Sequence, residues 1–249
     1  MSKFKDKVVV ISGGNSGIGL ASVQGFLREG AKVVFSGRRQ EALDEVSLTL
    51  EGDFKAVLAD QSKLEDNKKL IDEAVSTYGK IDVLFANAGV AYFVSSDQID
   101  EDHFDTQFNI NVKGPAFLVK NALPHLNDGG SIIFNTSIVN QKGFEGSAVY
   151  SASKGALRSY ARVLTTELAP RGIRVNSVSP GPITTPLFGK IGFSEEVLDE
   201  VGKGYAEAVP LKRFGEPREI ANSVMFLASE EASFVNGIEL EVDGGLSQI

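Results

Sequence analysis

The sequence predicts an α/β fold built on a doubly wound parallel sheet of about seven strands. Short, continuous apolar runs alternate with longer amphipathic segments, which is typical of parallel strands buried between two layers of helices. A glycine-rich turn directly follows the first apolar run. No linker, repeat or low-complexity stretch divides the 249 residues, so we expect residues 1–249 to form a single domain. Right-handed crossovers between the strands would then make the sheet doubly wound.

Seven strand-like runs are the expected strands. They are Val8–Ile11, Val33–Phe35, Ala56–Leu58, Val83–Ala86, Ile132–Phe134, Arg174–Val178 and Ile238–Val242. Between most of them the apolar residues recur at helical spacing, as in Leu64, Leu70, Ile71, Ala74, Val75 and Tyr78. A long helix is expected from Ala148 to Ala169.

The alternation stops after the sixth strand. Residues 180–182, Pro-Gly-Pro, end the regular structure, and four glycines follow between residues 189 and 204. Val197, Val201 and Tyr205 recur at four-residue spacing, as on one face of a short helix. We expect residues 186–207 to be a substrate lid, with a loosely packed surface helix as the alternative.

Composition excludes several classes of function. The formal net charge is −8 and no run of Lys and Arg exceeds two residues, so nucleic-acid binding is not expected. The chain has no cysteine, and its two histidines, His103 and His125, lie far apart, so neither disulfides nor a metal site is expected.

Targeting signals are also not expected. The charged start leads into only four apolar residues, which is too short for the apolar core of a signal peptide. The longest strictly apolar run, Val224–Ala228, is far shorter than a membrane span. A cytoplasmic protein that does not bind membranes is the resulting expectation.

The glycine-rich turn after the first strand predicts a nucleotide site. Glycine lets phosphate oxygens approach the main chain at a helix N-terminus, where free N–H groups favour negative charge. The spacing is Gly-x3-Gly-x-Gly and not the more usual Gly-x-Gly-x2-Gly, so the position after strand one carries the argument. The expected cofactor contacts in this turn are Gly13, Asn15, Ser16, Gly17, Ile18 and Gly19.

The end of the second strand predicts which cofactor binds. An acidic residue there would bind the ribose 2′-hydroxyl of NAD, but the chain reads Ser36-Gly37-Arg38-Arg39. Arginine offers planar charged donors that suit a 2′-phosphate. We therefore expect NADP(H), with Gly37, Arg38 and Arg39 as contacts; the alternative is that both arginines are merely solvated.

Tyr150 is the candidate acid/base. It is the one tyrosine of five with a lysine, Lys154, four positions later, and both residues share one face of the expected long helix. A nearby ammonium favours the phenolate, so we expect Lys154 to lower the pKa of Tyr150. Ser137, after the fifth strand, could hydrogen-bond a substrate oxygen as charge develops. An amide at Asn109 or Asn111 could hold a water beside the lysine, and chemistry alone does not separate the two.

Together these residues resemble the short-chain dehydrogenase/reductase family, whose fold is Rossmann-like, over essentially the whole chain. The resemblance aligns Asn111, Ser137, Tyr150 and Lys154 with the catalytic residues of that family and favours Asn111 over Asn109. It also implies cofactor contacts at Asp60, Gln61, Asn87, Ala88, Gly89, Pro180, Gly181, Ile183 and Thr185, in addition to Tyr150 and Lys154. Ala86 departs from the family's Asn-Asn-Ala-Gly motif, and Val242-Asp243-Gly244-Gly245 is typical of its C-terminal end.

The resemblance implies a reaction. NADPH would deliver hydride to a carbonyl carbon, Tyr150 would donate the proton, and Ser137 would position the oxygen. Lys154 would hold the nicotinamide ribose, and Asn111 would support a water relay. A narrower resemblance, to bacterial NADP-dependent alcohol dehydrogenases that accept bulky secondary alcohols, rests on residues 13–20, 83–87 and 237–240.

The partners expected are a small apolar carbonyl or alcohol substrate and copies of the same chain in a homotetramer. Apolar lid residues, Leu187, Phe188, Ile191, Phe193, Val197, Leu198, Val201 and Tyr205, would cover the substrate, unless they pack on the core or on a neighbouring subunit. The rival functions are a 3-oxoacyl-carrier-protein reductase of the same family and a non-catalytic NADP-binding regulator.

Overall fold

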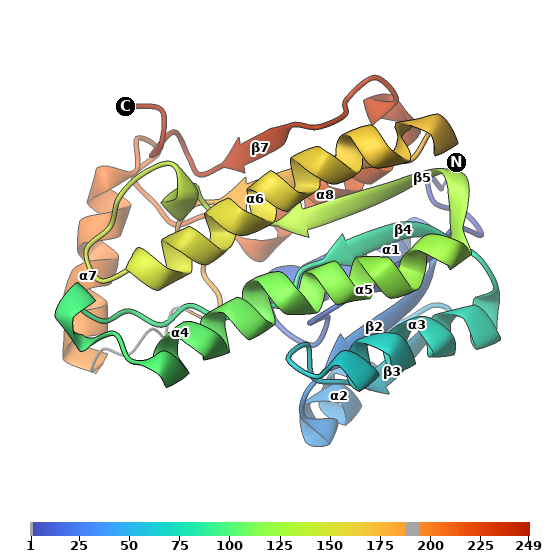
Figure 1. Cartoon of the computed structure of the whole chain (residues 1–249), viewed down its shortest axis with the longest axis horizontal. Helices are drawn as coiled ribbons and strands as arrows, with labels where there is room; N and C mark the ends of the chain where they lie inside the picture. The colour runs from blue at the N-terminus through green and yellow to red at the C-terminus, as the bar shows by residue number, and fades with distance from the viewer. Residues whose placement is uncertain (1, 188–194) are drawn as a thin grey trace.

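A single seven-stranded parallel sheet organises the computed structural model, which describes residues 2–187 and 195–249 (Figure 1). The strand order is β3-β2-β1-β4-β5-β6-β7, and every adjacent pair is parallel. The strands are β1 (Val8–Ile11), β2 (Lys32–Gly37), β3 (Phe54–Leu58), β4 (Ile81–Ala86), β5 (Leu126–Asn135), β6 (Arg174–Pro180) and β7 (Glu239–Val242). The predicted doubly wound fold and its seven strands are therefore confirmed.

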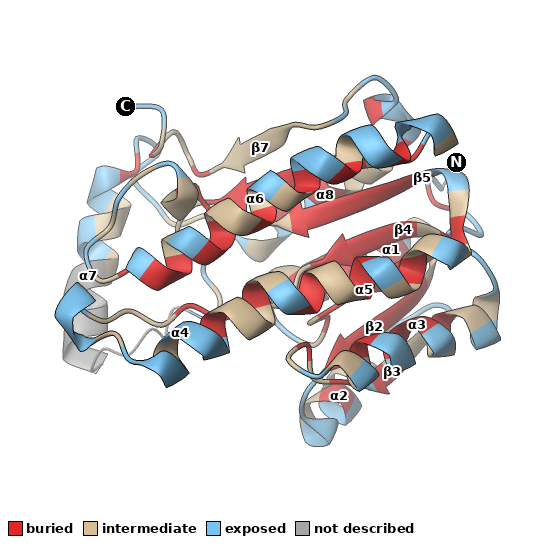
Figure 2. Cartoon of the chain, in the orientation of Figure 1, coloured by how far each residue is buried: buried red, intermediate tan, exposed pale blue. Residues whose placement is uncertain are grey.

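Helices cover both faces of the sheet. They are α1 (Gly17–Arg28), α2 (Gln40–Ser47), α3 (Leu64–Tyr78), α4 (Glu101–Phe108), α5 (Gly114–Ala122), α6 (Ala148–Leu168), α7 (Glu195–Ala208) and α8 (Pro217–Ala228). One core joins the sheet to α3, α5 and α6, and a second joins it to α1, α2 and α8. Figure 2 shows the central strands and the inner faces of these helices buried, whereas β7 is intermediate.

The two-sided covering explains why β1 is apolar at every position. In β1, Val8 and Val10 point into the core with α3, α5 and α6, whereas Val9 and Ile11 point into the core with α1 and α8. Successive side chains of a strand face opposite sides of a sheet, so a strand buried on both sides cannot alternate apolar with polar residues.

The strand order reverses at β1, and this reversal creates a crevice. The chain runs outward from β1 through β2 and β3, then returns to the other side of β1 with β4. Ile11 pairs with both Phe35 and Phe85, so the loops after β1, β2 and β4 leave the sheet at the same edge. Ligands of open α/β sheets bind at such a switch point, beyond the carboxyl ends of the strands.

Two further segments shape this edge. A π-helical turn, η2 (Asn109–Lys113), joins α4 to α5, and such turns often occur at functional sites. The helix predicted around Val197 and Tyr205 is present as α7. Phe188, Ile191 and Phe193 lie outside the described residues.

Candidate active site

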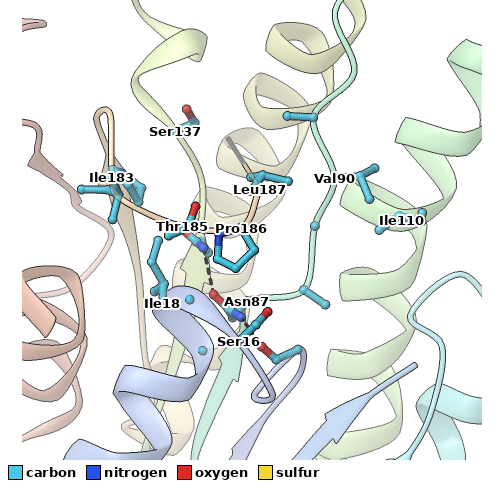
Figure 3. A pocket seen from close by; sticks show the side chains of 18 of the residues that line it. Ser16, Ile18, Asn87, Val90, Ile110, Ser137, Ile183, Thr185, Pro186 and Leu187 are labelled. Atoms are coloured by element: carbon cyan, nitrogen blue, oxygen red, sulfur yellow. Dashed lines mark hydrogen bonds between the residues drawn. The ribbon is translucent and has the colours of Figure 1, made fainter. Parts of the chain in front are cut away.

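A cavity of about 350 Å3 lies at the carboxyl edge of the sheet. Loops after six of the strands, β1 to β6, contribute to its wall. Figure 3 shows side chains from several of these loops, among them Ser16, Asn87, Ser137 and Ile183, around this one pocket. All the predicted site residues except Asn111 line it.

Three glycines of the turn are packed too closely for a side chain at their positions. Gly13 has φ +68°, and a Cβ there would lie 3.0 Å from Ala88 Cα. A Cβ at Gly19 would lie 2.0 Å from the carbonyl oxygen of Gly13. Gly17 has φ +51° and faces the side chain of Thr185. Only glycine fits these positions, so the main chain itself forms the wall.

The start of α1 suits an anion. Its N-cap residue, Ser16, makes no side-chain capping hydrogen bond, and the first turn contains no acidic residue. The first N–H groups of a helix have no partner within the helix, and the helix dipole favours negative charge beside them. The turn and helix start together fit the pyrophosphate of a dinucleotide.

Asn87 clamps this turn to β4. Its side-chain Nδ2 donates to the carbonyl oxygens of Ser12 and Gly13, both at 3.0 Å. The hydroxyl of Ser12 accepts from the backbone N–H groups of Asn87 and Ala88, both at 3.1 Å. The Asn-Ala-Gly segment therefore holds the shape of the glycine turn.

The far end of the cavity carries the two arginines. Gly37 ends β2 and is buried, whereas Arg38 and Arg39 are exposed at the cavity wall. Neither guanidinium has a hydrogen-bond or ion-pair partner among the residues that the structure describes. Nearby, the carboxylate of Asp60 accepts hydrogen bonds from the backbone N–H and the hydroxyl of Ser62, at 2.9 and 2.8 Å. The next side chain, Gln61, has its Nε2 buried without a hydrogen-bond partner in the described part of the chain. Two charged donors and an unpaired amide fit an adenosine half that bears a 2′-phosphate.

The segment after β6 forms the opposite wall. Gly181 packs against β7, where an added Cβ would lie 2.6 Å from Asp243 Cβ. The next residues pair with the strand-like Gly215, because Thr184 N donates to Gly215 O at 2.9 Å and Gly215 N donates to Pro182 O at 2.9 Å. Pro180, Gly181, Ile183 and Thr185 therefore line the cavity from a fixed backbone.

Three predicted catalytic side chains meet between these walls. Tyr150 and Lys154 project from the first two turns of α6 and are 8% and 4% exposed. Lys154 Nζ lies 5.7 Å from the centre of the Tyr150 ring and donates to the carbonyl oxygen of Asn135 at 2.7 Å. Ser137 follows β5, and its side chain faces the phenol of Tyr150.

Burial controls the protonation of this pair. Burial lowers the pKa of Lys154 to about 8, and the negative charge of Glu239 opposes that change. Burial raises the pKa of Tyr150 above its usual value, although the hydrogen bond from Ser137 lowers it. The lowered pKa that was expected for Tyr150 is therefore wrong as a net effect in this structure: burial raises the pKa, and the group that lowers it is Ser137.

Asn111 lies beside the lysine, as expected, but behind the wall of the cavity. It is 1% exposed, lies in the π-helical turn η2, and does not line the cavity. Its Oδ1 accepts from Val90 N at 2.9 Å, and its Nδ2 donates to Val90 O at 2.9 Å and to Ser153 Oγ at 3.0 Å. Both amide hydrogens are thus used by the protein, so the side chain is not free to donate to a relay water. A Cβ at Gly89 would lie 3.2 Å from Asn111 Oδ1 and 3.4 Å from Lys154 Nζ, which places Asn111 directly behind the lysine.

Sequence reasoning missed several residues of this site. Asn135 anchors Lys154 through its carbonyl and donates from Nδ2 to Asn87 Oδ1 at 2.9 Å, so it links the lysine to the clamp on the glycine turn. Its place at the end of the fifth strand, two residues before Ser137, was the available signal. Phe93, Phe144 and Leu246 also line the cavity. They come from loops and from the C-terminal segment, where no sequence pattern marked them.

In the ranges 2–187 and 195–249, no three His, Cys, Asp or Glu side chains are grouped so that they could hold a metal ion. Every helix in those ranges is too short or too polar to cross a membrane.

Comparison with known proteins agrees with this geometry. A family model described as Enoyl-(Acyl carrier protein) reductase matches residues 13–247. NADPH-dependent aldehyde reductase 1, chloroplastic, of Arabidopsis thaliana is 39% identical over 256 residues, which cover 98% of this chain and 87% of that protein. Glucose and ribitol dehydrogenase of Daucus carota is 37% identical, with 98% and 86% covered. The crystal structure of levodione reductase superimposes with a TM-score of 0.94 at 28% identity and covers 98% of this chain and 99% of that one.

The fold and the site define a nicotinamide-dependent oxidoreductase. The chain belongs to the short-chain dehydrogenase/reductase family.

Proposed function

We propose that this protein is an NADPH-dependent oxidoreductase that interconverts secondary alcohols and ketones by hydride transfer. The observation that carries the proposal is the combination of two exposed, unpaired arginines at the end of β2 with Tyr150, Ser137 and Lys154 in one cavity. The printed name of the Arabidopsis relative, an NADPH-dependent aldehyde reductase, supports the same cofactor and the same type of reaction.

The residues of the chain divide the work of binding. The start of α1 and the glycine turn would hold the pyrophosphate, and Arg38 and Arg39 would hold the 2′-phosphate. Asp60 and Gln61 would contact the adenine, with Asn87, Ala88 and Gly89 beneath the cofactor. Pro180, Gly181, Ile183 and Thr185 would hold the nicotinamide end.

When bound, NADPH supplies the hydride that reduces the carbonyl carbon. Tyr150 donates its proton to the carbonyl oxygen, and the hydroxyl of Ser137 hydrogen-bonds the same oxygen as negative charge develops there. Lys154, held by Asn135 O, stabilises the phenolate that the proton transfer leaves on Tyr150. Alcohol oxidation uses the same groups in reverse.

The walls beside Tyr150 favour an apolar substrate of some size. The ring of Phe93 lies 6.1 Å from that of Tyr150, and the ring of Phe144 lies 5.8 Å from that of Tyr205 on α7. These rings and Leu187 line the cavity. Apolar walls exclude water and bind apolar groups, so we propose that bulky ketones are better substrates than small ones and that residues 186–207 cover them.

Initial rates at saturating NADPH with acetone, 2-octanone and propiophenone test this substrate class. Each buried methylene contributes about 0.8 kcal/mol, so two additional apolar contacts correspond to roughly a tenfold higher kcat/KM. We expect both larger ketones to exceed acetone by at least this factor. Equal values for all three would place the substrate elsewhere and contradict the proposed pocket.

A second candidate is reduction of a 3-oxoacyl thioester. The name of the matching family model contains a carrier-protein substrate, which favours this candidate. Acetoacetyl thioesters belong in the same panel, because faster turnover of these than of any simple ketone would favour that function. Absence of turnover across the whole panel, with NADPH still bound, would favour a non-catalytic regulator.

We also propose a homotetramer. Phe234, five residues before the start of β7, is fully exposed, and β7 is the last strand of the sheet, so this edge can accept another copy of the chain. Light scattering coupled to size-exclusion chromatography measures the mass, and a monomeric mass would contradict this assembly.

A further inference from the structure

Glu239, the first residue of β7, has a buried carboxylate that lies outside the cavity. Its side chain is 7% exposed. Oε1 accepts from Asn140 Nδ2 at 2.9 Å, and Oε2 accepts from Gln141 Nε2 at 3.1 Å. Arg158 of α6, whose side chain is 11% exposed, places Nε 3.5 Å from Oε2. One carboxylate thus joins β7, α6 and the turn after β5.

The turn after β5 is the one that carries Ser137. Ser137 is the N-cap of the short helix η4 (Ile138–Asn140). Asn140 N donates to Ser137 O at 3.2 Å, and Val139 N donates to Ser137 Oγ at 3.4 Å. Because Asn140 is held by Glu239 at its side chain and by Ser137 at its backbone, the carboxylate fixes the backbone from which Ser137 faces Tyr150.

The helix α6 is the one that carries Lys154. Arg158 lies one turn beyond Lys154, and its Nη2 donates to Gly237 O at 2.9 Å, next to β7. The ion pair with Glu239 therefore holds this part of α6 against β7. Two nitrogens of Arg158, Nε and Nη1, are buried without a hydrogen bond among the described residues, so the negative charge of Glu239 is the feature that makes burial of this guanidinium tolerable.

The charge of Glu239 also acts on Lys154. Burial lowers the pKa of Lys154, and Glu239 raises it, which favours the ammonium form. The other groups that face the lysine are the Tyr150 phenol on α6 and the uncharged Asn135 and Asn111.

Around Glu239 itself, the charged groups are Arg158 on α6 and Glu241 on β7. Glu241 accepts from Gln141 Nε2 at 2.7 Å, and Arg162 repels Arg158. Glu239 and Glu241 thus share a hydrogen-bond donor, but the effect on Lys154 comes from Glu239.

We propose that Glu239 is a positioning residue for the proposed reaction: its buried carboxylate holds the turn of Ser137 against the part of α6 that carries Lys154. Replacing the carboxylate also removes a negative charge, and a pH profile measures that effect separately. The inference rests on the proposed function and adds to it a residue that touches neither substrate nor cofactor. It makes two separable claims, one about position and one about charge.

Two variants separate these claims. Glu239→Gln keeps the shape and one oxygen for Asn140 but removes the charge. Asn140→Ala keeps the charge and removes the side-chain hydrogen bond that ties Glu239 to the turn of Ser137. The matched control is Glu241→Gln, which makes the same charge change two residues along the same strand. Each protein is assayed for ketone reduction with NADPH from pH 6 to 10, and its dissociation constant for NADPH is measured by fluorescence.

With Glu239→Gln we expect kcat to fall about tenfold, since small displacements of catalytic groups have effects of this size. We also expect the decline of kcat at high pH to move to lower pH. With Asn140→Ala we expect a lower kcat with the decline at the parental pH. NADPH affinity should stay within about twofold in both, because neither residue lines the cavity. Glu239→Gln leaves the buried guanidinium of Arg158 without its ion pair, and the variant could fail to fold for that reason. In that case the double variant Glu239→Gln with Arg158→Met removes both charges, and we expect the same shift of the kcat decline to lower pH.

The inference is overturned if Glu239→Gln matches Glu241→Gln in both kcat and pH profile, or if Asn140→Ala has the parental kcat. A parent protein that turns over no carbonyl compound with NADPH would instead contradict the proposed function itself.

Discussion

Arg38 gives the sharpest test of cofactor choice. It is exposed at the cavity wall, at the end of β2, and has no partner among the described residues, so a bound 2′-phosphate would be its principal contact. A hydrogen bond to a charged group contributes about 1.5–3 kcal/mol. Taking about 2 kcal/mol for this exposed position, Arg38→Gln should lower kcat/KM for NADPH about 30-fold, since each 1.4 kcal/mol is tenfold. NADH has no 2′-phosphate, and its kcat/KM should change by less than about twofold.

Initial rates from the nicotinamide absorbance, with one ketone at fixed concentration, measure both constants. The matched control is Arg218→Gln, an exposed arginine on α8 that does not line the cavity. Adding an acid should go further: Gly37→Asp with Arg38→Val should favour NADH, because a carboxylate repels the phosphate and binds a free 2′-hydroxyl. A Cβ at residue 37 would lie 2.8 Å from Asn15 Cγ, the end of a side chain that can shift. An equal loss for both cofactors, or none for either, would refute this assignment of Arg38.

Two other predictions concern the glycine turn and pH. Gly19→Ala would put Cβ 2.0 Å from Gly13 O, so we expect NADPH binding to be lost in fluorescence titrations. Gly155→Ala, where nothing lies within 4 Å, should bind normally and unfold at a slightly higher temperature; unchanged binding in both variants would contradict the role of the turn. The pKa of Lys154 is about 8, below its usual value, so its ammonium is present at neutral pH and is lost as pH rises through about 8. We therefore expect kcat/KM for NADPH in ketone reduction to decline above that pH, and a flat profile to pH 10 would show that the charge is not needed.

The fold could be predicted from sequence because both faces of the sheet are covered. Strands such as β1 and β4 then read as nearly continuous apolar runs, and all seven strand-like runs correspond to strands. The boundaries were less accurate where exposure changes along a strand. β5 begins at Leu126, six residues before the predicted Ile132, because its exposed start reads Asn-Asp-Gly-Gly, which is typical of a turn.

The site was predicted where residue type alone sets the chemistry, as for the glycine turn, Tyr150 and Lys154. It was not predicted where three-dimensional packing decides. The π-helical turn that buries Asn111 has no pattern in sequence, so the amide was expected beside water and is instead bonded to Val90 and Ser153. The direction of the pKa shift of Tyr150 depends on its burial, which spacing from Lys154 cannot reveal. Glu239 reaches the site from 85 residues beyond Lys154 in sequence, and only the strand order brings the two together.

The central claim is that Tyr150 is the acid that protonates a ketone oxygen while NADPH is bound. Tyr150→Phe removes one hydroxyl and leaves the ring, which packs near Phe93, in place. The most direct test measures NADPH oxidation with propiophenone and, in the same preparation, the dissociation constant for NADPH. The account predicts that turnover falls by about 1,000-fold or more while the dissociation constant changes by less than about threefold. Turnover within about tenfold of the parent would contradict the assignment of Tyr150 as the proton donor.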